Sequence, residues 1–128
     1  MKYPDQFFKR FQKKSKHGMR GYPMATLAFY GPDDRKATKV AVGIIATEGA
    51  EVDPLARWFS EEVDIRKNNG VGKEITDFIQ SHEVKTIAMV ERIMGCPHEE
   101  GKDYPDGTFC PLCPFWKERD RFTGERLY

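Results

Sequence analysis

The residues best suited to chemistry in this chain of 128 residues lie close together, within positions 95–116. All three cysteines and one of the three histidines are in this stretch: Cys96, His98, Cys110 and Cys113. Thiolates and imidazoles are preferred ligands of Zn²⁺, and a structural zinc site takes four of them in a tetrahedron. The Tyr-Pro-Asp-Gly turn at 104–107 can fold the two ligand pairs back to face each other. The sequence therefore predicts a compact, knuckle-like zinc site made by these four residues.

The same stretch also resembles half of a catalytic zinc site. His98 and Glu100 match the H-x-E part of the zinc deaminase signature, which is likewise followed by a CxxC pair. Only nine residues separate Glu100 from Cys110, too few for a helix and a strand between the two halves. Cys96 would also fill the fourth coordination position, which leaves none for an activated water. We therefore expect a structural zinc and no catalytic residue.

The sequence around the four ligands has a distinctive order. GCPHEEG, DYP and CPLCPFW follow one another, with RDRFTGE after them and FYGPDDRKATKVAVGII before them. This pattern resembles a group of small uncharacterised bacterial proteins, over roughly residues 20–125. The resemblance implies that hairpin, sheet and metal loop form one module in a bacterial protein. It implies no catalytic residues.

Two expected β-strands precede the metal stretch, at about 24–31 and 38–46. Both are rich in β-branched and aromatic residues, and the polar segment PDDRKA separates them, which predicts a β-hairpin over about 24–46. The second strand is almost entirely apolar after Lys39. We therefore expect this strand to be buried on both faces and to lie in the centre of the sheet.

The residues after the hairpin predict further elements. An amphipathic helix is expected at about 71–82, followed by a buried strand at about 84–90 that leads into the zinc loop. This crossover is long enough for a parallel partner strand, so the fold is α/β or α+β, with helices on a face of the sheet. For 52–66 we favour a helix, since Asp-Pro starts it and apolar residues recur at helical spacing. A short strand around Trp58 and Phe59 is the alternative.

The N-terminal region is basic and amphipathic. Residues 4–16 place three phenylalanines at helical spacing among lysines and arginines. Residues 1–40 hold ten Lys and Arg against three acids, a charge of +7, although the whole chain has only +1. We divide the chain into a basic helix or arm at 1–20 and a single α/β domain at 21–128 that includes the zinc loop 95–116.

The composition is that of an ordinary globular protein, with 32% charged and 12% aromatic residues. No apolar run approaches the roughly 20 residues that span a bilayer, and the N-terminus lacks the pattern of a secretory signal. We expect a cytoplasmic protein with no membrane contact. Clustered cysteines in the reducing cytosol bind metal more often than they form disulfides.

The first functional hypothesis is a nucleic-acid-binding protein stabilised by zinc. A basic front and a knuckle are features of proteins that bind RNA or single strands. Phe11 or Tyr22 could stack on bases, although burial of the phenylalanines against the sheet is the better-supported alternative. The residues expected to contact phosphates are Arg10, Lys13, Lys14, Lys16 and Arg20.

Two alternative functions remain open. Residues 41–128 carry eleven Lys and Arg against seventeen acids, a charge of −6, and four of these acids lie in the metal loop: Glu99, Glu100, Asp103 and Asp106. Such a loop suits a protein-interaction or regulatory module that binds a basic protein partner. The second alternative is a metal-dependent enzyme that processes nucleic acid, with a hard cation held by Asp33, Asp34, Asp64 and Glu74.

Overall fold

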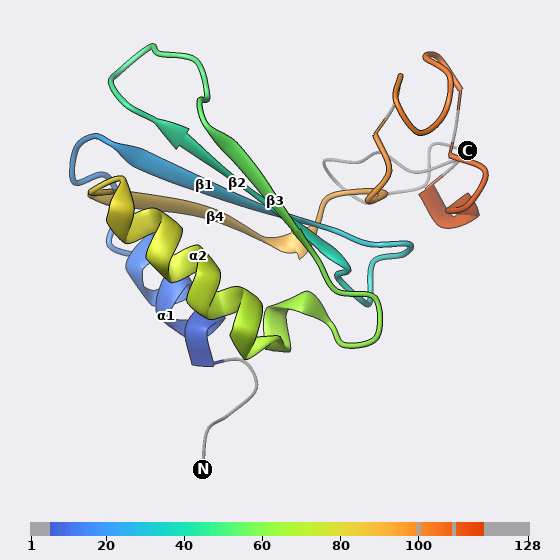
Figure 1. Cartoon of the computed structure of the whole chain (residues 1–128), viewed down its shortest axis with the longest axis horizontal. Coiled ribbons are helices and arrows are strands. Elements are labelled where there is room, and N and C mark those ends of the chain that lie inside the picture. The colour runs from blue at the N-terminus through green and yellow to red at the C-terminus, as the bar shows by residue number, and fades with distance from the viewer. Residues whose placement is uncertain (1–5, 100, 109, 117–128) are drawn as a thin grey trace.

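The fold is α+β, as the sequence predicts. A computed structural model describes residues 6–99, 101–108 and 110–116, apart from the side chains of Gln6 and Glu91 (Figure 1). In this part of the chain, four strands form one sheet and two α-helices cover one of its faces. The elements in chain order are α1 (Gln6–Ser15), β1 (Met24–Tyr30), β2 (Lys39–Ile45), β3 (Leu55–Phe59), the 3₁₀-helix η1 (Ile65–Lys67), α2 (Asn69–Ser81), β4 (Thr86–Ile93) and the 3₁₀-helix η2 (Pro114–Trp116).

The sheet is mixed, with the strand order β3-β2-β1-β4. The β1–β2 and β2–β3 pairs are antiparallel, and β4 is parallel to β1. The predicted hairpin and the parallel partner strand are thereby confirmed. Strand β2 lies inside the sheet and is mostly buried, which confirms the position predicted from its apolar sequence. The helix before β4 begins two residues earlier than expected, and β4 continues three residues further, to Ile93.

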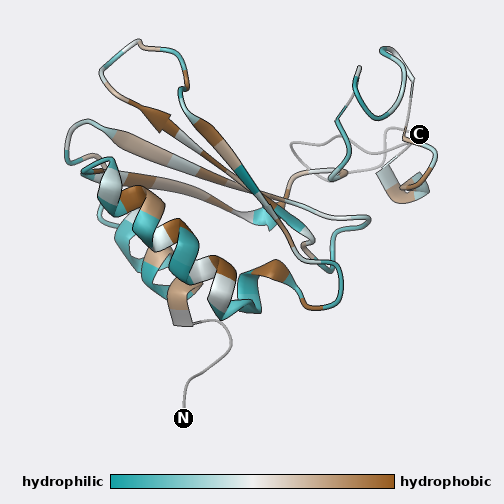
Figure 2. Ribbon diagram, in the orientation of Figure 1, coloured by the Kyte–Doolittle hydropathy of each residue, from teal (hydrophilic) through white to brown (hydrophobic). Residues whose placement is uncertain are grey.

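The hydrophobic core lies between the sheet and the helix layer. On β1, alternate residues are buried beneath the helices, and the buried residues Val71, Ile75 and Ile79 of α2 belong to the same core (Figure 2). Helix α1 contributes Phe8 and Phe11, which are 5% and 6% exposed. The ring of Phe8 packs edge-on against that of Phe29, with 5.6 Å between the centroids. The phenylalanine face of the basic helix is therefore part of the core.

The helix that we favoured for residues 52–66 is wrong. Leu55–Phe59 is strand β3, which pairs along its length with β2. The apolar spacing fits a helix, but β2 needs hydrogen-bonding partners on both edges, and this pairing supplies them on one. Only the alternate residues Ala56 and Trp58 are partly buried, and Trp58 packs against Phe78 of α2 at a centroid distance of 5.7 Å. Tertiary pairing thus overrides the local pattern.

Candidate metal centre

The four predicted ligands lie together at one end of the sheet. The ligand atoms of Cys96, His98, Cys110 and Cys113 are all within 4.8 Å of one another. Nδ1 of His98 lies 3.2, 3.4 and 3.6 Å from the three Sγ atoms, in chain order. In a tetrahedral zinc site, bond lengths of about 2.3 Å to sulfur and 2.0 Å to nitrogen separate these atoms by roughly 3.5 Å. The four side chains are therefore close enough to hold a metal ion, with a geometry compatible with zinc.

Strand β4 delivers the first ligand pair. Beyond its end, the Met94 N–H donates to the Phe29 carbonyl, and the Gly31 N–H donates to the Gly95 carbonyl, each at 2.8 Å. These bonds hold the chain beside the end of β1 up to the residue before Cys96. The His98 N–H then donates to Cys96 Sγ at 3.2 Å, which closes a tight turn around the sulfur.

The second pair is brought back by the loop between the two halves. This loop is folded by the buried side chain of Tyr104, by bonds from the Lys102 and Asp103 N–H groups to the Glu99 carbonyl, and by a turn at 105–108. The Cys113 N–H donates to the Cys110 carbonyl at 3.3 Å, so the CxxC pair also forms a turn. After it, Trp116 is buried and its Nε1–H donates to the Gly31 carbonyl at 2.8 Å. The C-terminal end of the metal loop is thereby anchored on the turn after β1.

Two thiols of this site, those of Cys96 and Cys113, are poorly ionised without a metal. Burial raises the pKa of Cys96 and of Cys113 above the value of a free thiol. A metal ion has the opposite effect, because it binds the thiolate and displaces the proton. Metal binding by these residues therefore releases protons, and the metal replaces the lost solvation of the buried sulfur atoms.

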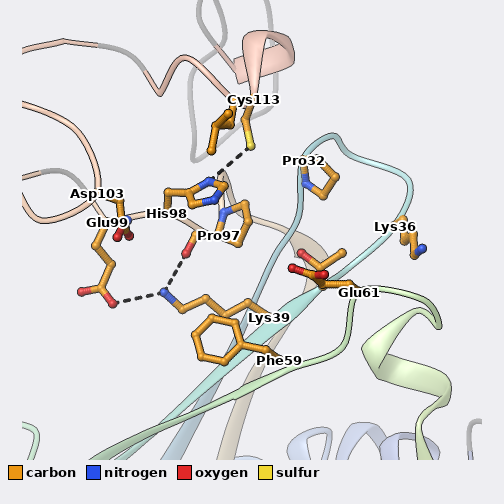
Figure 3. A pocket seen from close by; sticks show the side chains of 12 residues that line it. Pro32, Lys36, Lys39, Phe59, Glu61, Pro97, His98, Glu99, Asp103 and Cys113 are labelled. Atoms are coloured by element: carbon orange, nitrogen blue, oxygen red, sulfur yellow. Dashed lines mark hydrogen bonds and ion pairs between the residues drawn. The ribbon is translucent and has the colours of Figure 1, made fainter.

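A charged cluster beside the metal centre was not predicted from the sequence. The Lys39 ammonium, on a residue that is only 4% exposed, donates to the Pro97 carbonyl at 3.0 Å and to Glu99 Oε2 at 3.3 Å (Figure 3). Arg57 Nε lies 2.9 Å from the same Glu99 oxygen, and Lys102 is 3.9 Å from the other. Burial alone would raise the pKa of Glu99, but these three cations hold it below its usual value.

The residues expected to contact phosphates are all exposed. Three lie on α1 and two on the segment between α1 and β1: Arg10, Lys13, Lys14, Lys16 and Arg20. Helix α1, which carries three of them, lies away from the metal loop (Figure 1). Phe11 is buried and is unavailable for stacking on a base, whereas Tyr22 is partly exposed.

The carboxylates considered for a hard-cation site are dispersed over the described residues. Asp33 accepts backbone N–H groups in the loop after β1, and Asp64 pairs with Arg66. Glu74 accepts a hydrogen bond from Trp58 Nε1 at 3.2 Å. Within the described ranges, the Cys/His set is the only group of three or more His, Cys, Asp or Glu residues placed to hold a metal.

Comparisons with models of protein families, with curated proteins and with solved structures found no match to this chain. Among the residues that the structure describes, no helix has the length and apolar character needed to cross a membrane.

Proposed function

We propose that this chain is a cytoplasmic, zinc-stabilised protein that binds nucleic acid through a basic face. We define this basic face as Arg10, Lys13, Lys14, Lys16 and Arg20. The observation that carries the proposal is the exposure of all five side chains: three lie on α1, whose opposite side is anchored in the core, and two lie on the segment that follows it. In the described part of the chain, no carboxylate pairs with the four residues of this face that follow Arg10. Their charges are available to phosphates.

The donor set supports zinc as the metal. Three sulfurs and one imidazole nitrogen suit Zn²⁺ better than Mg²⁺ or Ca²⁺, which prefer oxygen ligands. With all four positions taken by side chains, the ion has no open position for water or substrate. The role that follows is structural: the zinc joins the chain after β4 to the segment that ends at the buried Trp116.

The alternative of an acidic loop that binds a basic partner has less support. The carboxylate of Glu99 is turned toward the sheet and is held by three basic side chains. Asp103 Oδ2 accepts the Glu99 N–H at 2.7 Å, so its charge also stabilises the loop itself. Glu100 lies outside the described residues. The enzyme alternative has no gathered carboxylates among the described residues.

The test is a binding titration. Zinc-loaded protein is added to labelled single-stranded DNA, duplex DNA and RNA, and anisotropy is followed at several salt concentrations. We expect binding that weakens steeply with salt, because contacts to phosphates release counterions. Changing Lys13→Glu and Lys14→Glu together should weaken binding and flatten the salt dependence, since two phosphate contacts are lost.

The matched control makes the same change in charge on other elements. Lys67→Glu and Lys73→Glu, on η1 and α2, are both exposed and leave the basic face intact. They should change the salt dependence less than the Lys13 and Lys14 pair does. Absence of binding to all three nucleic acids at low salt, or equal effects of the two double variants, would refute a role for the basic face.

A further inference from the structure

The face of the sheet opposite the helices carries an ordered set of side chains. Three strands contribute one residue each to successive rows, and the first row is Tyr30, Lys39 and Phe59. The next row is Ala28, Ala41 and Arg57. The following row is Thr26, Gly43 and Leu55. On this face the small residues Ala28, Ala41 and Gly43 are next to one another, and larger side chains surround them.

A pocket of about 360 Å³ lies where this face meets the metal loop. Its sheet side consists of Tyr30, Lys39, Ala41, Leu55 and Arg57, and its loop side of Gly95, Cys96, His98 and Glu99. A second pocket of about 510 Å³ adjoins it and shares Lys39, His98 and Glu99 (Figure 3). Small-molecule sites usually measure roughly 300–1,000 Å³ and combine apolar walls with a few polar groups. The first pocket has this size and this composition.

The basic side chains at the first pocket offer hydrogen-bond donors to an anion. Lys39 and Arg57 face it with the single carboxylate of Glu99, and Lys102 lies 3.9 Å from that carboxylate. Glu99 engages Nε and Nη2 of Arg57, but a guanidinium has five N–H donors, so donors remain for a second anion. The Arg57 side chain is 32% exposed, which leaves it accessible from solvent. Asp103 lines the second pocket and not this one.

The other walls of the pocket favour a ligand with an apolar or planar part. Tyr30, whose ring has the Lys39 ammonium 5.4 Å from its centroid, Ala41 and Leu55, which is 45% exposed, line the pocket from three neighbouring strands. Such walls gain little from a bare inorganic anion, because they would bury no apolar surface against it. An aromatic ring beside arginine can, in contrast, stack on a nucleobase while the guanidinium binds a phosphate.

We propose that this pocket binds a nucleoside monophosphate, with its phosphate at Arg57 and Lys39 and its base against Tyr30, Ala41 and Leu55. The geometry of the charged cluster makes Glu99 a competitor of the phosphate. Its carboxylate satisfies the two cations in the free protein and competes with the phosphate for them. This site is on the opposite side of the sheet from the basic face and is independent of the proposed nucleic-acid binding.

The experiment follows backbone amide resonances of zinc-loaded, ¹⁵N-labelled protein during titration with AMP, adenosine, ribose 5-phosphate and inorganic phosphate. We expect AMP to saturate with a Kd below about 1 mM and to shift the amides of Ala41, Arg57 and Gly95. Ribose 5-phosphate, adenosine and phosphate should each bind more weakly, because each lacks a part that the pocket recognises. Equal binding of AMP and ribose 5-phosphate, or no saturation by AMP, would overturn the proposal.

Variants separate this site from the basic face. Arg57→Met should weaken AMP binding about tenfold, since it removes charged hydrogen-bond donors but keeps an unbranched side chain. Lys73→Met, the same charge change on the helix side, should leave AMP binding unchanged. Glu99→Gln should strengthen AMP binding, because the competing negative charge is gone. An unchanged or lower affinity for AMP would contradict the competition between Glu99 and the phosphate. The Lys13→Glu and Lys14→Glu variant, which tests nucleic-acid binding, should bind AMP as the parent protein does.

Discussion

At the scale of single residues, Asp64 joins two parts of the chain. Its Oδ1 accepts the Arg66 N–H at 3.0 Å, and its Oδ2 accepts the Ala37 N–H at 3.2 Å and the Arg66 Nη2–H at 2.6 Å. The carboxylate thus caps η1 and fixes it to the loop between β1 and β2. Burial by itself would raise the pKa of Asp64, but the hydrogen bonds and the charge of Arg66 outweigh it and lower the pKa.

We expect Asp64→Asn to destabilise the fold by about 2 kcal/mol at pH 7, because hydrogen bonds to a charged group contribute about 1.5–3 kcal/mol. The pKa is lower in the folded protein than the ordinary value of 3.8, so the stabilisation is complete above that value. It is lost as the pH falls through the folded pKa. Urea unfolding at several pH values should therefore show a constant difference between pH 5 and 7 that shrinks below pH 4.

The control for this variant is Asp34→Asn, an exposed acid in the loop between β1 and β2. It should change the free energy of unfolding by less than about 0.5 kcal/mol at any of these pH values. If the loss caused by Asp64→Asn were the same at pH 3 as at pH 7, the ionised carboxylate would not be its source.

Residue-scale features differ in how far the sequence predicts them. The metal-ligand candidates could be found, because Cys96 and His98, and likewise the two remaining cysteines, are neighbours in the chain and their chemistry is narrow. The pairing of Lys39 with Glu99 could not be predicted, because 60 positions separate them and neither residue's sequence neighbours indicate a partner. Only the docking of the metal loop on the sheet brings them together.

At the scale of elements, the packing of α1 on α2 depends on the absence of a side chain. A Cβ atom added at Gly72 would lie 2.5 Å from Phe7 Cβ and 2.8 Å from its Cγ. Both positions belong to helix backbones whose buried residues are fixed in the core, so neither helix can move away freely. The close approach of α1 to α2 therefore requires glycine at this position.

We expect Gly72→Ala to destabilise the protein by about 1–3 kcal/mol, the usual cost of overpacking, although alanine favours a helix. Gly70→Ala is the matched control in the same helix, since its Cβ would meet only Asn68 Oδ1 at 3.4 Å. That variant should be neutral or more stable by up to about 1 kcal/mol. Thermal unfolding of both variants measures the difference, and equal stability of the two would contradict the contact between α1 and α2.

Among the helices and strands, sequence patterns predict some elements and not others. The hairpin, α2 and β4 were predictable because each has the apolar period of its own structure. Strand β3 was only the alternative prediction, because the spacing of Leu55, Trp58 and Phe59 also fits a helix and two of these residues stay exposed on the sheet. The segment becomes a strand because it pairs with the edge of β2, and the residues of the segment itself do not show that this edge is there.

At the scale of the whole molecule, the metal loop forms a third part beside the sheet and the helix layer. Four kinds of contact connect it to the sheet: the continuation of β4, the bond from Trp116 to Gly31, the bond from Lys39 to Pro97, and the ion pairs of Glu99. The bond from Trp116 comes from the second half of the loop, and the other contacts come from the first half. The ligand cluster lies at the point where its two halves meet, so metal binding should stabilise these contacts together.

We expect removal of a metal held by the Cys/His cluster to release Trp116 while the sheet and helices stay folded. At a free metal concentration a thousand times Kd, the bound metal stabilises the native state by about 4 kcal/mol, so a chelator should lower Tm. In a Trp58→Phe background Trp116 is the only tryptophan, and its emission should shift to the red as its buried indole meets water. Cys113→Ser should reproduce both effects, whereas Leu112→Ser, at a residue that is 72% exposed, should reproduce neither. Unchanged emission after complete loss of the metal would mean that the contacts of Lys39, Glu99 and Trp116 hold the loop without it.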